Sequence, residues 1–197
     1  MSRLSVLVVA GSLNDRSSTR VVTRAIAAAL REQGCSVDEV DLAREPLALF
    51  DPETAYQSEN YRLLQPRVEH ADVIVLGSPD YHGTIASPLK NFLDHFWQEF
   101  AGKLFATVVG SYDKGLTVSD HLRTVARQCY AWSMPYAVAF SDREDVIAGE
   151  IKSESFQKRL DMFVRDVRVY GEVIAAQRHK DLAATDHCFL ARLRKSA

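Results

Sequence analysis

Short runs of almost wholly apolar residues recur along this chain, and amphipathic segments of helical period separate them. The runs at residues 4–9, 72–77 and 104–109 are rich in β-branched side chains, which is typical of strands buried on both faces. Residues 36–42 alternate weakly, and residues 135–140 complete a set of five candidate strands. Since strands that are apolar on both faces need cover on both faces, this pattern predicts an α/β protein.

Helices are predicted between these strands. Apolar side chains recur at helical spacing over residues 19–33, 60–70, 88–97 and 115–129, and in a long segment after Lys152. Strands and helices that alternate in this way form a parallel sheet with right-handed crossovers. Five strands favour the flavodoxin-like order 2-1-3-4-5, which is a doubly wound five-stranded parallel sheet with helices on both faces.

The chain shows no shift in composition that would mark a domain boundary. We expect one flavodoxin-like domain over residues 1–178 and a C-terminal extension over residues 179–197. In that extension, the basic residues Arg192, Arg194 and Lys195 are expected to form a solvated end.

The charge balance restricts the partners. There are 24 lysines and arginines against 26 aspartates and glutamates, and a net charge of -2 argues against a basic face for nucleic acid. The apolar run near the N-terminus is too short for a signal peptide, and no stretch approaches the ~18 residues of a membrane span. The 3 cysteines are widely spaced, which fits neither a disulfide framework nor a metal site. We therefore expect a cytoplasmic protein.

The loop at residues 10–18 follows the first strand, and in sheets of this order ligands lie at the carboxyl ends of the strands, where the order reverses. Ser12, Ser17, Ser18 and Thr19 stand directly before a predicted helix, whose unpaired N–H groups favour a phosphate. A single hydroxyl that caps the helix is the alternative interpretation. The loop contains neither a P-loop nor a G-x-G-x-x-G motif.

Two further loops are expected at the same edge of the sheet. Residues 77–87 contain Pro79, Tyr81 and Gly83, a combination of tight turns and flat side chains that suits a planar aromatic ligand. Residues 110–115 begin and end in glycine, which permits a close approach of backbone to a ring. Ordinary exposed turns remain the alternative for both loops.

Two motifs on these loops resemble the NADPH-dependent FMN reductase family. They are Gly11-Ser12-Leu13 with Ser17-Ser18-Thr19, and Gly77-Ser78-Pro79-Asp80-Tyr81-His82-Gly83 leading into Ser87-Pro88-Leu89-Lys90-Asn91-Phe92-Leu93-Asp94. The resemblance covers roughly residues 4–175. It implies a flavodoxin-like fold and a role for the three loops in holding FMN.

The resemblance implies a site residue by residue. Ser12, Asn14, Ser17, Ser18 and Thr19 would hold the FMN phosphate. The isoalloxazine ring would be lined by Pro79, Asp80, Tyr81, His82 and Gly83, with Ser111, Tyr112 and Gly115 closing its other edge.

The implied activity is an oxidoreductase that passes hydride from NADPH or NADH to bound FMN and then to a small acceptor. Free flavin, quinones, azo dyes and metal oxyanions all stay open as acceptors, and a homodimer or homotetramer is expected. The cofactor would carry the chemistry, so we assign no catalytic acid, base or nucleophile and no metal ligand. No 2′-phosphate clamp is evident, so the choice between NADH and NADPH stays open. The alternative is a flavodoxin-like electron carrier without NAD(P)H activity.

Overall fold

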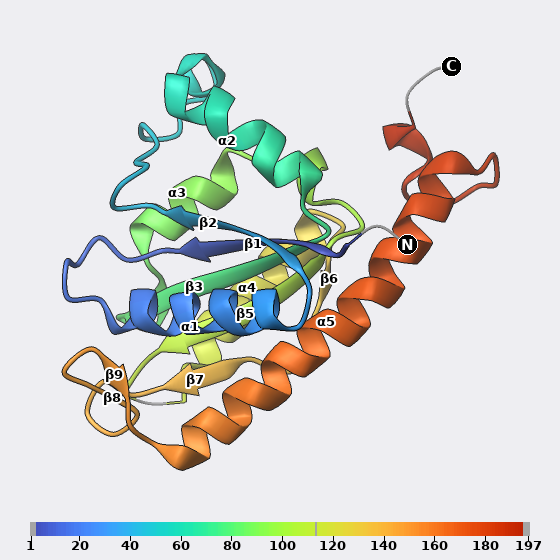
Figure 1. Ribbon diagram of the computed structural model, residues 1–197. Coiled ribbons are helices and arrows are strands. Elements are labelled where there is room, and N and C mark those ends of the chain that lie inside the picture. The colour runs from blue at the N-terminus through green and yellow to red at the C-terminus, as the bar shows by residue number, and fades with distance from the viewer. Residues whose placement is uncertain (1–2, 113, 195–197) are drawn as a thin grey trace.

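A central parallel sheet organises the computed structural model, which describes residues 3–112 and 114–194 (Figure 1). Its strands run in the order β2-β1-β3-β5-β6, and β7 also pairs with β5. This arrangement confirms the predicted 2-1-3-4-5 order, with β6 and β7 sharing the fifth position. The strands are β1 (Ser5–Ala10), β2 (Ser36–Asp41), β3 (Val73–Tyr81), β5 (Leu104–Gly110), β6 (Trp132–Ser133) and β7 (Val138–Phe140).

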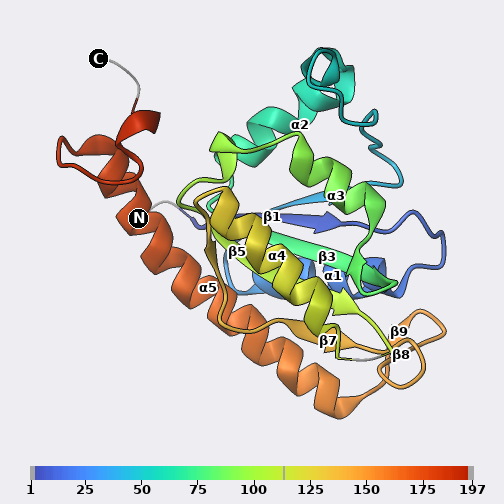
Figure 2. The same cartoon turned by 180° about the vertical axis from the view of Figure 1, so that it is seen from behind.

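Helices cover both faces of the sheet, as Figures 1 and 2 show from opposite sides. On one face lie α1 (Ser18–Glu32) and α5 (Glu154–Ala183), and on the other lie α2 (Glu59–His70), α3 (Ser87–Asp94) and α4 (Leu116–Gln128). Alternate residues of β1 enter the two cores: Val6 and Val8 pack toward α1 and α5, while Leu7 and Val9 pack toward α2 and α3. The sheet is therefore buried on both faces, as its apolar strands require.

Short elements complete the fold. They are the 3-10 turns η1 (Ala55–Gln57), η2 (Gln98–Phe100) and η3 (Ala191–Leu193), the strand β4 (Thr84–Ile85), and a hairpin of β8 (Val146–Ile147) and β9 (Glu150–Ile151). None of the helices in the described part of the chain is long and apolar enough to cross a membrane.

The fifth strand differs from the predicted run over residues 135–140. It is divided into β6 and β7, and the segment between them contains Pro135, a residue that is uncommon inside paired strands. Strand β6 pairs with the start of β5, and β7 pairs with Val108, Val109 and Gly110 at its carboxyl end.

The segment at residues 77–87 is also more regular than a loop. Strand β3 continues through Tyr81 and turns back into β4, which pairs antiparallel with Asp80 and Tyr81. His82 and Gly83 form the two-residue turn, with φ angles of 57° and 74°. Positive φ at both positions is the requirement of a type I′ hairpin, which explains the glycine.

The C-terminal residues form a solvated end only in part. Helix α5 continues past residue 178 to Ala183, and Leu190 is buried at 1% exposure. Arg194 donates hydrogen bonds to the carbonyl oxygens of Asp181 and Asp186, and Arg192 stacks on Tyr130. The predicted solvated end is therefore confirmed for Arg192, which is exposed, and wrong for Arg194, which is partly buried, while Lys195 lies outside the described residues. The division into residues 1–178 and 179–197 stays a prediction.

Candidate functional site

A pocket of about 260 Å³ opens at the carboxyl edge of the sheet, between the segments that follow β1, β3, β5 and β7. The segment after β1 supplies the hydroxyl-rich loop, and the ends of β3 and β5 supply the opposite wall. The lining residues are Ser12, Asn14, Arg16, Ser17, Ser18, Thr19, Pro79, Asp80, Tyr81, Gly110, Ser111, Tyr112, Phe140 and Asp142.

Two glycines bring the first two segments into contact. The N–H of Gly11 donates a hydrogen bond of 2.8 Å to the carbonyl oxygen of Gly77. A Cβ at Gly11 would lie 2.7 Å from that oxygen, and a Cβ at Gly77 would lie 2.4 Å from Cγ2 of Thr23. A larger residue at either position would therefore push the loop after β1 away from β3.

The start of α1 forms the anionic-ligand end of the pocket. Ser17 caps the helix, because its Oγ accepts a hydrogen bond of 3.2 Å from the N–H of Arg20. Ser12 Oγ accepts from the N–H of Asn14 at 3.3 Å, which tightens the loop. The N–H groups of Ser18 and Thr19 have no acceptor within the helix, since they belong to its first turn. Both residues line the pocket, so their amides and hydroxyls are suited to an oxyanion.

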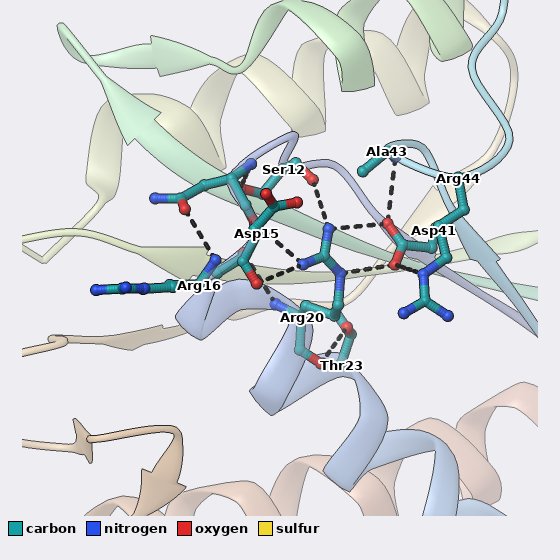
Figure 3. A network of polar contacts seen from close by, with 10 residues as sticks. Ser12, Asp15, Arg16, Arg20, Thr23, Asp41, Ala43 and Arg44 are labelled. Carbon is teal, nitrogen blue, oxygen red and sulfur yellow. Dashed lines mark hydrogen bonds and ion pairs between the residues drawn. The ribbon is translucent and has the colours of Figure 1, made fainter.

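Arg20 supports this loop from behind (Figure 3). Its guanidinium donates to the carbonyl oxygens of Ser12, Asn14 and Asp15 at 3.3, 3.0 and 3.2 Å. The same group pairs with Asp41, at 2.6 Å from Nε to Oδ2 and 3.1 Å from Nη2 to Oδ1. Asp41 ends β2 beside Ala10, the last residue of β1, so the pair fixes the loop to the sheet edge.

The Arg20–Asp41 pair was not among the site residues predicted from the sequence. Its only signal is an arginine in the first turn of a helix, where a positive charge opposes the helix dipole. An acidic partner at the end of the neighbouring strand explains that charge. The pairing depends on β2 lying beside β1. From the sequence, this neighbour can be inferred only through the predicted strand order.

Asp80 joins the walls of the ring end of the pocket. Its Oδ1 accepts a hydrogen bond of 2.8 Å from the N–H of Gly83, and its Oδ2 accepts one of 2.9 Å from the hydroxyl of Ser111. On the outer side of the same hairpin, Thr84 Oγ1 and His121 Nδ1 lie 3.0 Å apart in a hydrogen bond that connects β4 to α4. Hydrogen bonds therefore hold the β3–β4 hairpin to the segment after β5 on one side and to α4 on the other.

Aromatic side chains form the rim of this end. Tyr81 is half exposed and Tyr112 is largely exposed. The guanidinium of Arg143 lies 4.5 Å from the centre of the Tyr112 ring, a cation–π contact that holds the ring against the segment after β7. Phe140, at the end of β7, adds a buried aromatic wall.

The structure brings together ten of the thirteen residues predicted for the site. Outside the pocket lining are His82 and Gly83, which form the hairpin turn, and Gly115, which precedes α4. The predicted loop at 110–115 also includes Asp113, which lies outside the described residues. The pocket adds Arg16, Gly110, Phe140 and Asp142, and the last two follow from the fifth strand ending at the same edge.

In the described part of the chain, no three His, Cys, Asp or Glu side chains gather into a group able to hold a metal ion. Cys35, Cys129 and Cys188 are free thiols.

A doubly wound sheet with an oxyanion-binding loop after β1 and an aromatic-rimmed crevice at the switch point defines a flavodoxin-like protein. Residues 4–145 match the family model described as NADPH-dependent FMN reductase. The chain belongs to this family and is an oxidoreductase of that class.

Named relatives agree with this assignment. The chain is 29% identical over 173 residues to an FMN-dependent NADPH-azoreductase of Staphylococcus saprophyticus, an alignment that covers 82% of this chain and 92% of the relative. It superposes on the apo form of an NADH:FMN oxidoreductase (EMOB) with a TM-score of 0.72 at 16% identity, covering 85% of this chain and 89% of the other. For FerB, a flavoenzyme NAD(P)H:(acceptor) oxidoreductase from Paracoccus denitrificans, the TM-score is 0.70 at 19% identity, and the coverages are 86% and 97%. The two structures support the fold.

Proposed function

We propose that the pocket at the carboxyl edge binds FMN, and that the protein uses it to carry electrons from NADPH or NADH to a small acceptor. The observation that carries the proposal is one pocket that combines an oxyanion-binding helix start with an aromatic-rimmed crevice. FMN has the matching chemistry, because it joins a phosphate to a flat heterocycle.

The donor set fits the phosphate. The first-turn N–H groups of α1, the hydroxyls of Ser18 and Thr19, the side chain of Asn14 and the guanidinium of Arg16 all line this end. A doubly charged phosphate gains from such amides and from a guanidinium in particular. Ser12 and Ser17 hold the loop and cap the helix, so we assign them to shaping the site as well as to binding.

The ring end fits a planar heterocycle. Pro79, Asp80 and Tyr81 would lie along one edge, and Gly110, Ser111 and Tyr112 along the other. A Cβ at Gly110 would lie 2.9 Å from the Phe140 ring, so only glycine at this position lets the backbone and the ring pack this closely. His82, Gly83 and Gly115 would act through the turns they form, which orient the lining residues.

When bound, FMN supplies the hydride chemistry itself, so the chain needs no nucleophile of its own. The work of the protein is to bind, to orient and to limit water around the ring. Asp80 serves this purpose because it holds the β3–β4 hairpin against Ser111. We expect backbone N–H groups of the two loops to stabilise negative charge that develops on the ring.

We propose free flavin, quinones, azo dyes or metal oxyanions as acceptors. The name of the staphylococcal relative refers to azo reduction and to NADPH. A homodimer or homotetramer in the cytoplasm, without nucleic acid or membrane partners, also remains part of the proposal.

The test begins with the visible spectrum of the purified protein, before and after FMN is added. We expect a flavin spectrum, anaerobic bleaching by NADPH without a partner protein, and turnover with at least one acceptor of a panel. Bleaching that requires a second protein would instead identify an electron carrier. A colourless protein whose melting temperature FMN does not raise would overturn the proposal.

A further inference from the structure

Three arginines lie along the start of α1 at intervals of four residues, at positions 16, 20 and 24. Arg20 and Arg24 are spaced by four and so lie on one flank of the helix, while Arg16 stands in the loop before it. Arg20 is committed to Asp41 and to the carbonyl oxygens of the loop. Over residues 3–112 and 114–194, the guanidinium groups of Arg16 and Arg24 have neither an ion pair nor a hydrogen bond. Two unpaired cations therefore stand on the flank of the phosphate loop.

These cations line a groove of about 720 Å³ between α1 and the β8–β9 hairpin. The groove shares Arg16, Ser17 and Ser18 with the FMN pocket, so the two spaces are continuous. Its other wall is apolar and consists of Val21 on the helix with Val146 and Ala148 on the hairpin. We call this space the arginine groove. Figure 1 shows the hairpin beside the start of α1.

The charges in the groove are not evenly distributed. Its two carboxylates, Asp15 and Asp142, lie toward the FMN pocket: Asp15 precedes the helix, and Asp142 lines both spaces. Arg24 lies seven residues beyond Ser17, about 10 Å along the helix axis. At the far end of the groove, the Arg24 guanidinium therefore stands beside apolar side chains and forms no ion pair with a described residue, although the carboxylates of Glu39, Asp41 and Glu45 line the pocket on its other side.

We infer that the arginine groove binds the adenosine 2′-phosphate of NADPH, with Arg24 as the residue that distinguishes it from NADH. The inference rests on the proposed function, since it needs the nicotinamide to reach the FMN pocket. A guanidinium suits a phosphate because it donates two parallel hydrogen bonds and stays charged. Val21 and Val146 offer apolar surface to the adenosine, and the continuity of the groove with the pocket allows one dinucleotide to occupy both.

The first arm of the test is steady-state kinetics of the FMN-loaded protein with both nucleotides. Arg24→Gln is expected to lower kcat/KM for NADPH about tenfold through KM, which is the effect of one charge-assisted hydrogen-bond pair, and to leave kcat/KM for NADH unchanged. Arg24→Lys should recover part of the loss. Arg31→Gln is the matched control, because Arg31 lies on the same helix, outside the groove, in a pair with Glu39.

The second arm measures binding without turnover. By calorimetry, adenosine 2′,5′-bisphosphate should bind the wild-type protein about tenfold more tightly than adenosine 5′-monophosphate, and Arg24→Gln should remove that preference. Equal affinity of the wild-type protein for the two adenosine phosphates would overturn the inference. An equal loss for NADPH and NADH in Arg24→Gln would also overturn it, because Arg24 would then bind a group that both share.

The two proposals fail in different ways. A protein that does not take up FMN contradicts the proposed function. In that case, the calorimetric comparison of the two adenosine phosphates still tests whether the arginine groove binds a 2′-phosphate. A protein that takes up FMN and oxidises both nucleotides with a ratio that Arg24→Gln does not change contradicts the groove alone.

Discussion

The hydroxyl of Ser111 donates a hydrogen bond of 2.9 Å to Oδ2 of Asp80, which joins the end of β5 to the hairpin after β3. The other oxygen of the same carboxylate accepts the N–H of Gly83. Both walls of the ring end thus depend on one side chain.

Asp80→Ala is expected to weaken the binding of FMN and of riboflavin by the same factor, about tenfold, because it loosens the ring end and leaves the phosphate end intact. Fluorescence titration with both flavins measures the two dissociation constants. Asp120→Ala, an exposed carboxylate on α4, serves as the control. A loss confined to FMN would contradict the assignment of Asp80 to the ring.

Ser17 and Ser18 are adjacent but have different roles. Ser17→Ala removes the cap of α1 and should lower the free energy of unfolding of the flavin-free protein by about 1 kcal/mol. Ser18→Ala should leave that free energy unchanged and weaken FMN more than riboflavin, because Ser18 lines the phosphate end of the pocket and does not cap the helix. Urea unfolding and flavin titration of both variants separate the two effects. A larger stability loss in Ser18→Ala than in Ser17→Ala would refute the division of roles.

The Arg20–Asp41 pair should contribute far more to stability than a second pair between the same two elements. The side chains of Arg20 and Asp41 are 11% and 15% exposed, whereas those of Arg31 and Glu39 are 46% and 35% exposed. Arg20→Met leaves the nearly buried carboxylate of Asp41 with only the exposed Arg44, 3.7 Å away, as a cationic partner and is expected to cost about 3 kcal/mol. Arg31→Met should cost less than about 1 kcal/mol.

A double-mutant cycle checks this prediction. Arg20→Met with Asp41→Leu should be less destabilising than the sum of the two single changes, because neither charge is then left unpaired. Additive costs, or equal costs for the Arg20 and Arg31 variants, would show that the first pair does not fix the loop.

Lys103 should make stability depend on pH. Burial lowers the pKa of its ammonium from 10.5 to about 7, while its Nζ donates to the carbonyl oxygens of Val68 and Glu69 at the end of α2. Above pH 7 the unfolded chain therefore holds one more proton than the folded chain, so the free energy of unfolding rises with pH. Burial raises the pKa of Cys129 to about 11, which opposes this trend above about pH 9.

The expected rise between pH 7 and pH 9 is about 2 kcal/mol, and Lys103→Met should abolish it whatever its effect on stability at a single pH. Urea unfolding of both proteins at several pH values measures the slopes. Parallel slopes for the wild type and Lys103→Met would mean that Lys103 stays charged in the folded protein.

Much of the fold can be predicted from the sequence, because it depends on patterns within short segments of the chain. Runs such as residues 73–76 are apolar on both faces, and the strand order then follows from the number of strands. Each loop begins where a strand ends, and parallel strands end at the same edge of the sheet. For this reason Ser12, Ser18 and Ser111 could be predicted to lie at one edge. The sequence predicts only a loop where the His82–Gly83 hairpin lies, since β4 has two residues and carries no strand pattern.

The features that sequence reasoning missed depend on contacts between distant segments. Arg20 finds Asp41 only because β2 lies beside β1, and Asp142 joins the pocket only because β7 ends beside Gly110. The burial of Leu190 requires Gly102, where a Cβ would lie 2.9 Å from the leucine side chain. Such pairings are set by packing in three dimensions, and no periodicity in the chain encodes them.

The central claim is that FMN lies in the pocket with its phosphate at the start of α1, and a crystal structure of the protein with FMN tests it most directly. We predict phosphate oxygens within hydrogen-bond distance of the N–H groups of Ser18 and Thr19, and the ring between Tyr81 and Tyr112. Density for FMN outside this pocket, or with its phosphate away from Ser18 and Thr19, would contradict the account.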